Sequence, residues 1–136
     1  MNTPALFLGA LALTLSPTVG SAKDTAAGQG EAKLAKLLDG RAAGTPTSCI
    51  DTPYRMAGGG LQVIDGVGLV YDAGKTVYVA RATDPQVLRW TDRLDSTRAV
   101  STRLCVSDHF WTSDRATGAQ TGVVFLKDFV PYTKAG

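Results

Sequence analysis

Residues 61–81, LQVIDGVGLVYDAGKTVYVAR, contain two tight-turn signals between short apolar runs. The first is Asp65-Gly66. Asp-Gly between apolar runs is the strongest short-range hairpin signal, because both turn positions of such a hairpin favour a positive φ. With a two-residue loop, the predicted cross-strand partners are Ile64 with Val67, Gln62 with Leu69 and Leu61 with Val70.

The second signal, Ala73-Gly74, predicts another hairpin, in which Asp72 lies opposite Lys75 as a charge pair. Its return strand is predicted over residues 76–81. The middle strand, 67–71, is apolar on both faces, which is typical of a strand covered on two sides. Further strands are expected around 99–106, 109–112 and 121–126, ending at 129–132. The sequence therefore predicts a mainly β fold, a small antiparallel meander forming a barrel or sandwich.

One short N-terminal helix is predicted at residues 31–39, EAKLAKLLD. Leu34, Leu37 and Leu38 share one helical face, and Gly40 is placed to cap the C-terminus. Residues 23–30 are expected to be flexible, and residues 40–48 form a linker to Cys49. Residues 82–99 are a long loop or begin with a helical turn at Asp84-Pro85. The predicted organisation is a signal peptide over 1–22, a flexible N-terminus with the helix over 23–44, and a β domain over 45–136.

The first residues predict a cleavable signal peptide. Residues 5–15, ALFLGALALTL, are apolar but too short to span a bilayer as a helix. Gly20 and Ala22 fit the small-x-small pattern of signal peptidase sites, so cleavage near Ala22 would leave Lys23 as the first residue. We expect a periplasmic or secreted protein with no membrane span in the mature form.

Cysteine usage agrees with export, because the chain contains two cysteines, Cys49 and Cys105. An even number in a small exported chain predicts a disulfide. A redox-active pair would favour close C-x-x-C spacing, and a zinc site would need more ligands than two cysteines and His109 supply. We therefore expect a structural disulfide, no metal site and no cofactor.

Few residues suggest catalysis. Ser107-Asp108-His109 contains the residue types of a hydrolase triad, but adjacent residues on a strand point to opposite faces and a triad converges from distant parts of a chain. No catalytic residue is predicted, and His109 and Asp108 remain weak candidates. Gly58-Gly59-Gly60 does not lie between a strand and a helix, so it matches no phosphate-binding loop and is interpreted as a connector. The net charge of +2 is too slight for nucleic-acid binding.

The candidate binding surface is aromatic and basic. It comprises Trp90, with Arg89 and Arg93 beside it in the sequence, and Trp111. Tryptophan next to arginine suits a sugar or an anionic glycan, through stacking and charge-assisted hydrogen bonds. The alternative is that both tryptophans belong to the core of this small domain.

The chain resembles a group of small exported proteobacterial proteins, of the domain-of-unknown-function type, with a leader, a first cysteine and a β meander. The residues that carry the resemblance are Cys49-Ile50, Ile64-Asp65-Gly66, Leu69-Val70-Tyr71, Val77-Tyr78-Val79, Leu104-Cys105 with Asp108, and Phe129-Val130-Pro131-Tyr132. The resemblance implies the architecture and the compartment, and it implies no catalytic residue.

These observations favour a non-enzymatic exported domain that binds an envelope component, such as a glycan, or a protein partner. One alternative is a small hydrolase-like enzyme that uses His109. Another is a protein inhibitor of a hydrolase that presents the polar loop 113–120.

Overall fold

The computed structural model describes residues 26–52, 61–96 and 102–135. The elements in chain order are helix α1 (Ala26–Leu37), β1 (Arg41–Ala43), β2 (Cys49–Asp51), β3 (Leu61–Ile64), β4 (Gly68–Asp72), β5 (Thr76–Arg81), a 3-10 turn (Pro85–Val87), β6 (Asp92–Ser96), β7 (Arg103–Cys105), β8 (Phe110–Asp114), β9 (Gln120–Val124) and β10 (Val130–Lys134). The largest sheet has the order β1-β10-β5-β4-β3, and all its neighbouring strands are antiparallel. A second sheet has the order β6-β8-β9, and β2 pairs with β7.

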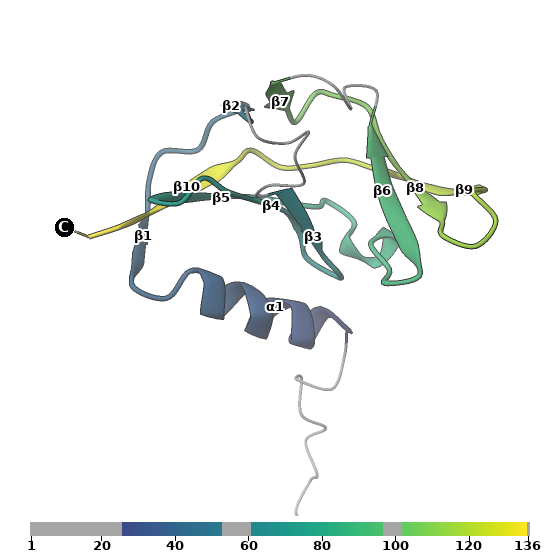
Figure 1. Cartoon of the computed structure of the whole chain (residues 1–136), viewed down its shortest axis with the longest axis horizontal. Coiled ribbons are helices and arrows are strands. Elements are labelled where there is room, and N and C mark those ends of the chain that lie inside the picture. The colour runs from purple at the N-terminus through teal and green to yellow at the C-terminus, as the bar shows by residue number, and fades with distance from the viewer. Residues whose placement is uncertain (1–25, 53–60, 97–101, 136) are drawn as a thin grey trace, which may run out of the picture.

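The elements form layers around the five-stranded sheet (Figure 1). Helix α1 covers one face, where Leu34 packs in a core with Val70 and Val79. The other face meets a larger core that includes Leu104 and Phe129. The predicted mainly β fold is confirmed as a sandwich-like arrangement of antiparallel sheets with one helix, and the described strands close no barrel.

Strand β4 is the middle strand predicted to be covered on two sides. Leu69 and Tyr71 belong to the larger core, whereas Val70 belongs to the core under α1. All three side chains are buried. The interpretation of this strand is confirmed.

The hairpin at Asp65-Gly66 forms, but its predicted register is wrong by one residue. Val67 belongs to the loop, where its N–H donates to the Ile64 carbonyl at 3.0 Å. Within this loop Gly66 has a positive φ, +69°, but Asp65 does not, so the turn is not the type I′ turn that a two-residue Asp-Gly loop requires. The observed partners are Ile64 with Gly68, Val63 with Leu69, Gln62 with Val70 and Leu61 with Tyr71.

The second hairpin also forms with a different loop, so the predicted Asp72–Lys75 pair is wrong. Asp72 lies opposite Val77, and the Ala73 N–H donates to the Thr76 carbonyl, which leaves Gly74-Lys75 as the two loop residues. Gly74 has φ +90°, as the first loop position of a type II′ turn requires. The Asp72 carboxylate instead accepts the Gly74 N–H at 2.8 Å.

Helix α1 begins at Ala26, earlier than the predicted start at Glu31, so residues 26–30 are helical rather than flexible. Leu34 is buried and Gly40 has φ +70°, as the predicted apolar face and cap require. The predicted linker contains β1, which pairs with β10.

Residues 82–96 contain both a helical turn and a strand. The Asp84 carboxylate accepts the Gln86 N–H at 3.3 Å and caps the 3-10 turn, as the Asp84-Pro85 signal indicated. Strand β6 follows and was not predicted. The first residue of β6, Asp92, is buried although it is charged. The sequence therefore lacks the alternation of apolar and polar residues that normally predicts a strand.

Cys49 and Cys105 form the predicted disulfide, with an S–S distance of 2.06 Å, and they lie directly opposite each other in the β2–β7 ladder. The predicted signal peptide and Gly58-Gly59-Gly60 lie outside the described residues. Within the described ranges, no helix has the length and apolar character needed to cross a membrane.

Candidate functional site

A groove of about 610 Å³ opens where three segments meet: the N-terminal half of α1, the β3–β4 hairpin and residues 85–91. Its lining is mainly apolar, with a few polar and charged side chains. The volume lies within the range of about 300–1,000 Å³ that small-molecule sites occupy. The groove therefore has room for a short saccharide or a ligand of similar size.

Trp90 lines this groove and is 76% exposed. It occupies a tight turn that the Asp92 N–H closes by donating to the Arg89 carbonyl at 3.0 Å. Leu88 before the turn and Asp92 after it are both buried. The chain is thus anchored on each side of the turn, and the indole between the anchors is presented to solvent.

The buried Asp92 carboxylate braces the turn. It accepts hydrogen bonds from the Thr121 hydroxyl at 2.8 Å and from the Thr91 hydroxyl at 3.3 Å. Arg115 adds two bonds to the backbone of this segment, from its N–H to the Thr91 carbonyl and from its Nε to the Asp92 carbonyl, both at 3.1 Å. Because a buried carboxylate is costly without such donors, this network holds the Trp90 turn in one conformation.

Helix α1 forms the opposite wall and is seated closely on the β3–β4 hairpin. A Cβ added to Gly30 would lie 2.3 Å from the Asp65 carbonyl oxygen, so only glycine permits this approach. On one flank of the helix, Gln29 and Lys33 line the groove at i, i+4 spacing.

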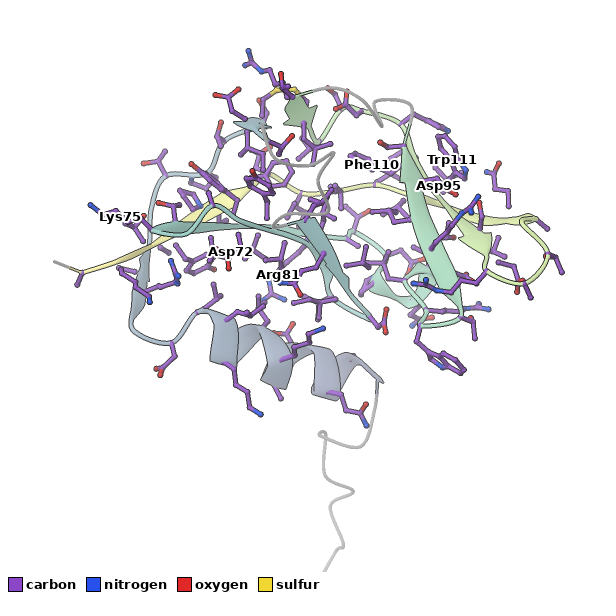
Figure 2. The ribbon with its side chains drawn as sticks, viewed as in Figure 1. Asp72, Lys75, Arg81, Asp95, Phe110 and Trp111 are labelled. Carbon is purple, nitrogen blue, oxygen red and sulfur yellow. A yellow bond between two sulfur atoms is a disulfide. The ribbon has the colours of Figure 1, made fainter. Side chains whose placement is uncertain are left out.

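On the other flank of α1, the Glu31 carboxylate pairs with both terminal nitrogens of Arg81 on β5. This hydrogen-bonded carboxylate raises the pKa of Arg81 above its ordinary value. In Figure 2 Arg81 lies between the five-stranded sheet and α1. The ion pair therefore helps to set the rotation of α1, and with it the direction in which the Gln29 and Lys33 flank faces.

The charges along the groove are unequal. Lys33 and Arg89 carry positive charge, and Asp65 carries the opposing negative charge. Gln29 and Gln86 add amide groups that both donate and accept hydrogen bonds. An aromatic side chain, two amides and an excess of cations together suit a hydroxyl-rich or anionic ligand.

The structure divides the four predicted binding residues between two places. Arg89 and Trp90 line the groove, whereas Arg93 and Trp111 line a second hollow of about 510 Å³ beside β6 and β8. There the Arg93 Nε donates to the Asp95 carboxylate at 3.1 Å, and Asp95 and Trp111 lie opposite each other in the sheet (Figure 2). Arg93 and Trp111 therefore do not extend the Trp90 surface.

Neither His109 nor Asp108 is among the described residues that line the groove or the second hollow. The Asp108 carboxylate accepts the Cys105 N–H at 2.8 Å and so stabilises a turn. His109 is exposed, its ring lies 5.7 Å from that of Trp111, and it is not among the described residues that line either hollow. This placement gives the hydrolase alternative no support.

The loop predicted to serve an inhibitor is a tight connection between β8 and β9. The Asp114 carboxylate accepts the N–H groups of Ala116 and Thr117 at 2.8 Å each, and these bonds lower the pKa of Asp114. Gly118 completes the turn with φ +72°. The hydrogen bonds give this exposed turn a defined shape. The turn is short, because β8 ends at Asp114 and β9 begins at Gln120.

Comparison with known proteins adds nothing to these observations, because no protein-family model, curated protein or solved structure matches the chain. The resemblance to small exported proteobacterial proteins therefore stays a prediction.

Sequence reasoning missed the part of the groove that α1 supplies. Gln29 and Lys33 are four positions apart, which places them on one flank of a helix. This spacing could be recognised only if the helix was expected to begin before Gln29. The two glycines nearby, Gly28 and Gly30, lower helix propensity and concealed it.

Proposed function

We propose that the protein is a non-enzymatic exported domain that binds an envelope glycan in the groove beside Trp90. The observation that carries the proposal is the 76% exposed indole on a turn braced by hydrogen bonds, at the edge of a groove of suitable size. A flat aromatic ring on a braced turn stacks on the apolar face of a sugar with little loss of conformational entropy, because an aromatic side chain has few rotatable bonds.

Two further features support a saccharide over a protein partner. The amides of Gln29 and Gln86 line the same groove as the indole and match the hydroxyl groups of a sugar, which both donate and accept hydrogen bonds. The apolar surface is a groove rather than a broad exposed patch, and a protein partner would favour the latter. Export is supported by the Cys49–Cys105 disulfide, because disulfides persist in oxidising compartments.

Co-sedimentation of the purified protein with insoluble envelope glycan tests this function. Trp90→Ala is expected to reduce the affinity at least tenfold, the size of a typical aromatic hot spot. Phe125→Ala is the matched control, because Phe125 is an aromatic residue that is 68% exposed and does not line the groove. The proposal fails if the wild type does not sediment with the glycan, or if both variants lose affinity equally.

The exported state has its own test. Protein recovered from outside the cytoplasm should begin near Lys23 and contain no free thiol. A mature protein that retains residues 1–22, or one with Cys49 and Cys105 reduced, would contradict export with disulfide formation.

A further inference from the structure

We infer that the groove selects acidic saccharides, with Lys33 and Arg89 binding a carboxylate while the sugar ring stacks on Trp90. This inference rests on the proposed function and names the ligand class of the same site. It makes Lys33 and Arg89 specificity-determining residues, and it gives the N-terminal helix a part in recognition.

Both cations are available to a ligand. Within the described parts of the chain, the side chains of Lys33 and Arg89 are exposed and neither forms an ion pair or a hydrogen bond. Other arginines of the domain are engaged: Arg81 pairs with Glu31, Arg93 with Asp95, and Arg115 bonds the backbone at Asp92. A ligand carboxylate would therefore displace no existing partner of Lys33 or Arg89.

The two cations belong to different walls of the groove. Lys33 projects from a flank of α1, and Arg89 directly precedes Trp90 on the facing turn. The Arg89 guanidinium lines the same groove as Trp90, and its planar fork can bind the carboxylate of a stacked sugar ring through two hydrogen bonds. The Lys33 ammonium would add a second positive charge from the helix side.

The balance of charge in the groove is positive. Asp65 is the acidic residue in the described lining, and it is half-buried in the β3–β4 hairpin, whereas both cations are exposed. Asp65 can accept hydrogen bonds from sugar hydroxyls, but it cannot offset two cations. A neutral saccharide can accept hydrogen bonds from Lys33 and Arg89 but gains no attraction between opposite charges, so an acidic chain should bind more tightly than a neutral chain of the same shape.

The probe for this inference is an oligogalacturonate, compared with the same oligosaccharide after methyl esterification, which removes the charge and keeps the sugar. Binding is followed through tryptophan emission in a Trp111→Phe background. The chain has two tryptophans, so Trp90 is then the only reporter. At low ionic strength the acid is expected to bind at least tenfold more tightly than the ester, and added salt should narrow the difference.

The double variant Lys33→Gln/Arg89→Gln should reduce the affinity for the acid to that for the ester and leave the ester unchanged. Lys36→Gln/Lys127→Gln is the matched control, because it removes the same charge from exposed positions that do not line the groove. It should retain the preference for the acid.

Three results would overturn the inference. Equal binding of acid and ester would do so while leaving a neutral-glycan function in place. An equal loss of preference in the control variant would show a general effect of net charge rather than selection by the groove. Absence of any Trp90 response to either probe would also overturn it, and sedimentation with envelope glycan would then decide the proposed function separately.

Discussion

Gly30→Ala tests whether α1 is seated on the hairpin as described. Gly30 lies in the middle of the helix and is buried. Alanine has the higher helix propensity by about 1 kcal/mol, so the isolated helix would favour the substitution. The tertiary contact opposes it, and the sign of the measured effect shows which contribution is larger.

The structure gives the size of the opposing effect. The new Cβ would lie 2.3 Å from the Asp65 carbonyl oxygen and 2.8 Å from Val67 Cγ2, whereas ordinary van der Waals contact begins at 3.4 Å. The nearest atom is backbone, so the helix itself must move away by about 1 Å. Overpacking of this kind costs about 1–3 kcal/mol. After the propensity gain of about 1 kcal/mol is subtracted, we expect Gly30→Ala to lower the free energy of unfolding by up to about 2 kcal/mol.

Urea denaturation measures this change through the transition midpoint at an unchanged m-value. Ala32→Gly is the internal control, because Ala32 is an exposed residue of the same helix and reports propensity alone. Ala32→Gly should lower the free energy of unfolding by about 1 kcal/mol. If Gly30→Ala instead gains the stability that Ala32→Gly loses, the helix does not contact the Asp65 backbone and the reasoning is refuted.

Three further changes test other parts of the fold. Replacing Cys49 and Cys105 with serine opens a crosslink between residues 56 positions apart and should lower the free energy of unfolding by about 4 kcal/mol in urea; a loss below about 1 kcal/mol would contradict a structural role. Asp114→Asn should destabilise the protein at neutral pH, because the lowered pKa of Asp114 means that its stabilisation is present above the ordinary carboxyl pKa and is lost as the pH falls through the folded-state value. Thermal melts of both proteins should therefore converge in acid, and a difference that persists there would argue against the carboxylate. Gly40→Ala should lower the free energy of unfolding by about 1 kcal/mol in chemical denaturation, because the φ of Gly40 is +70° and the space around it is open. Gly40→Asn should lower it less, because asparagine tolerates a positive φ better than alanine, and equal losses would exclude a conformational cause.

The sequence predicted both hairpins of the central sheet but neither register. Asp65-Gly66 is compatible with more than one turn type, and the choice depends on the φ of Asp65, which stays negative. One residue of difference in loop length shifts every cross-strand pair. Hydrophobic patterning was sufficient to identify β3, β4 and β5, because the apolar residues of these strands pack into cores on defined faces of the sheet. It could not specify a backbone angle in a turn.

The candidate site was predicted in part. Trp90 and Arg89 are adjacent in the sequence and share the groove, as expected for neighbours on one turn. Arg93 is three positions away from Trp90, but β6 begins at Asp92, so Arg93 follows the sheet instead of the turn. Trp111 could be related to the other three only through strand pairing. That pairing joins Trp111 to Asp95, away from the groove.

The groove lies where local sequence preference and final structure disagree most. Gly30 is a poor helix former in the middle of a helix, Asp92 is a charged residue in a buried position, and Trp90 is a large apolar residue in water. Each lowers stability compared with an ordinary choice at its position. Gly30 permits close seating of one wall, and Asp92 braces the turn of the other wall that displays Trp90. Such conflicts concentrate at functional sites, and these three lie in or directly behind the walls of one groove, so together they favour recognition at this groove over a purely structural role.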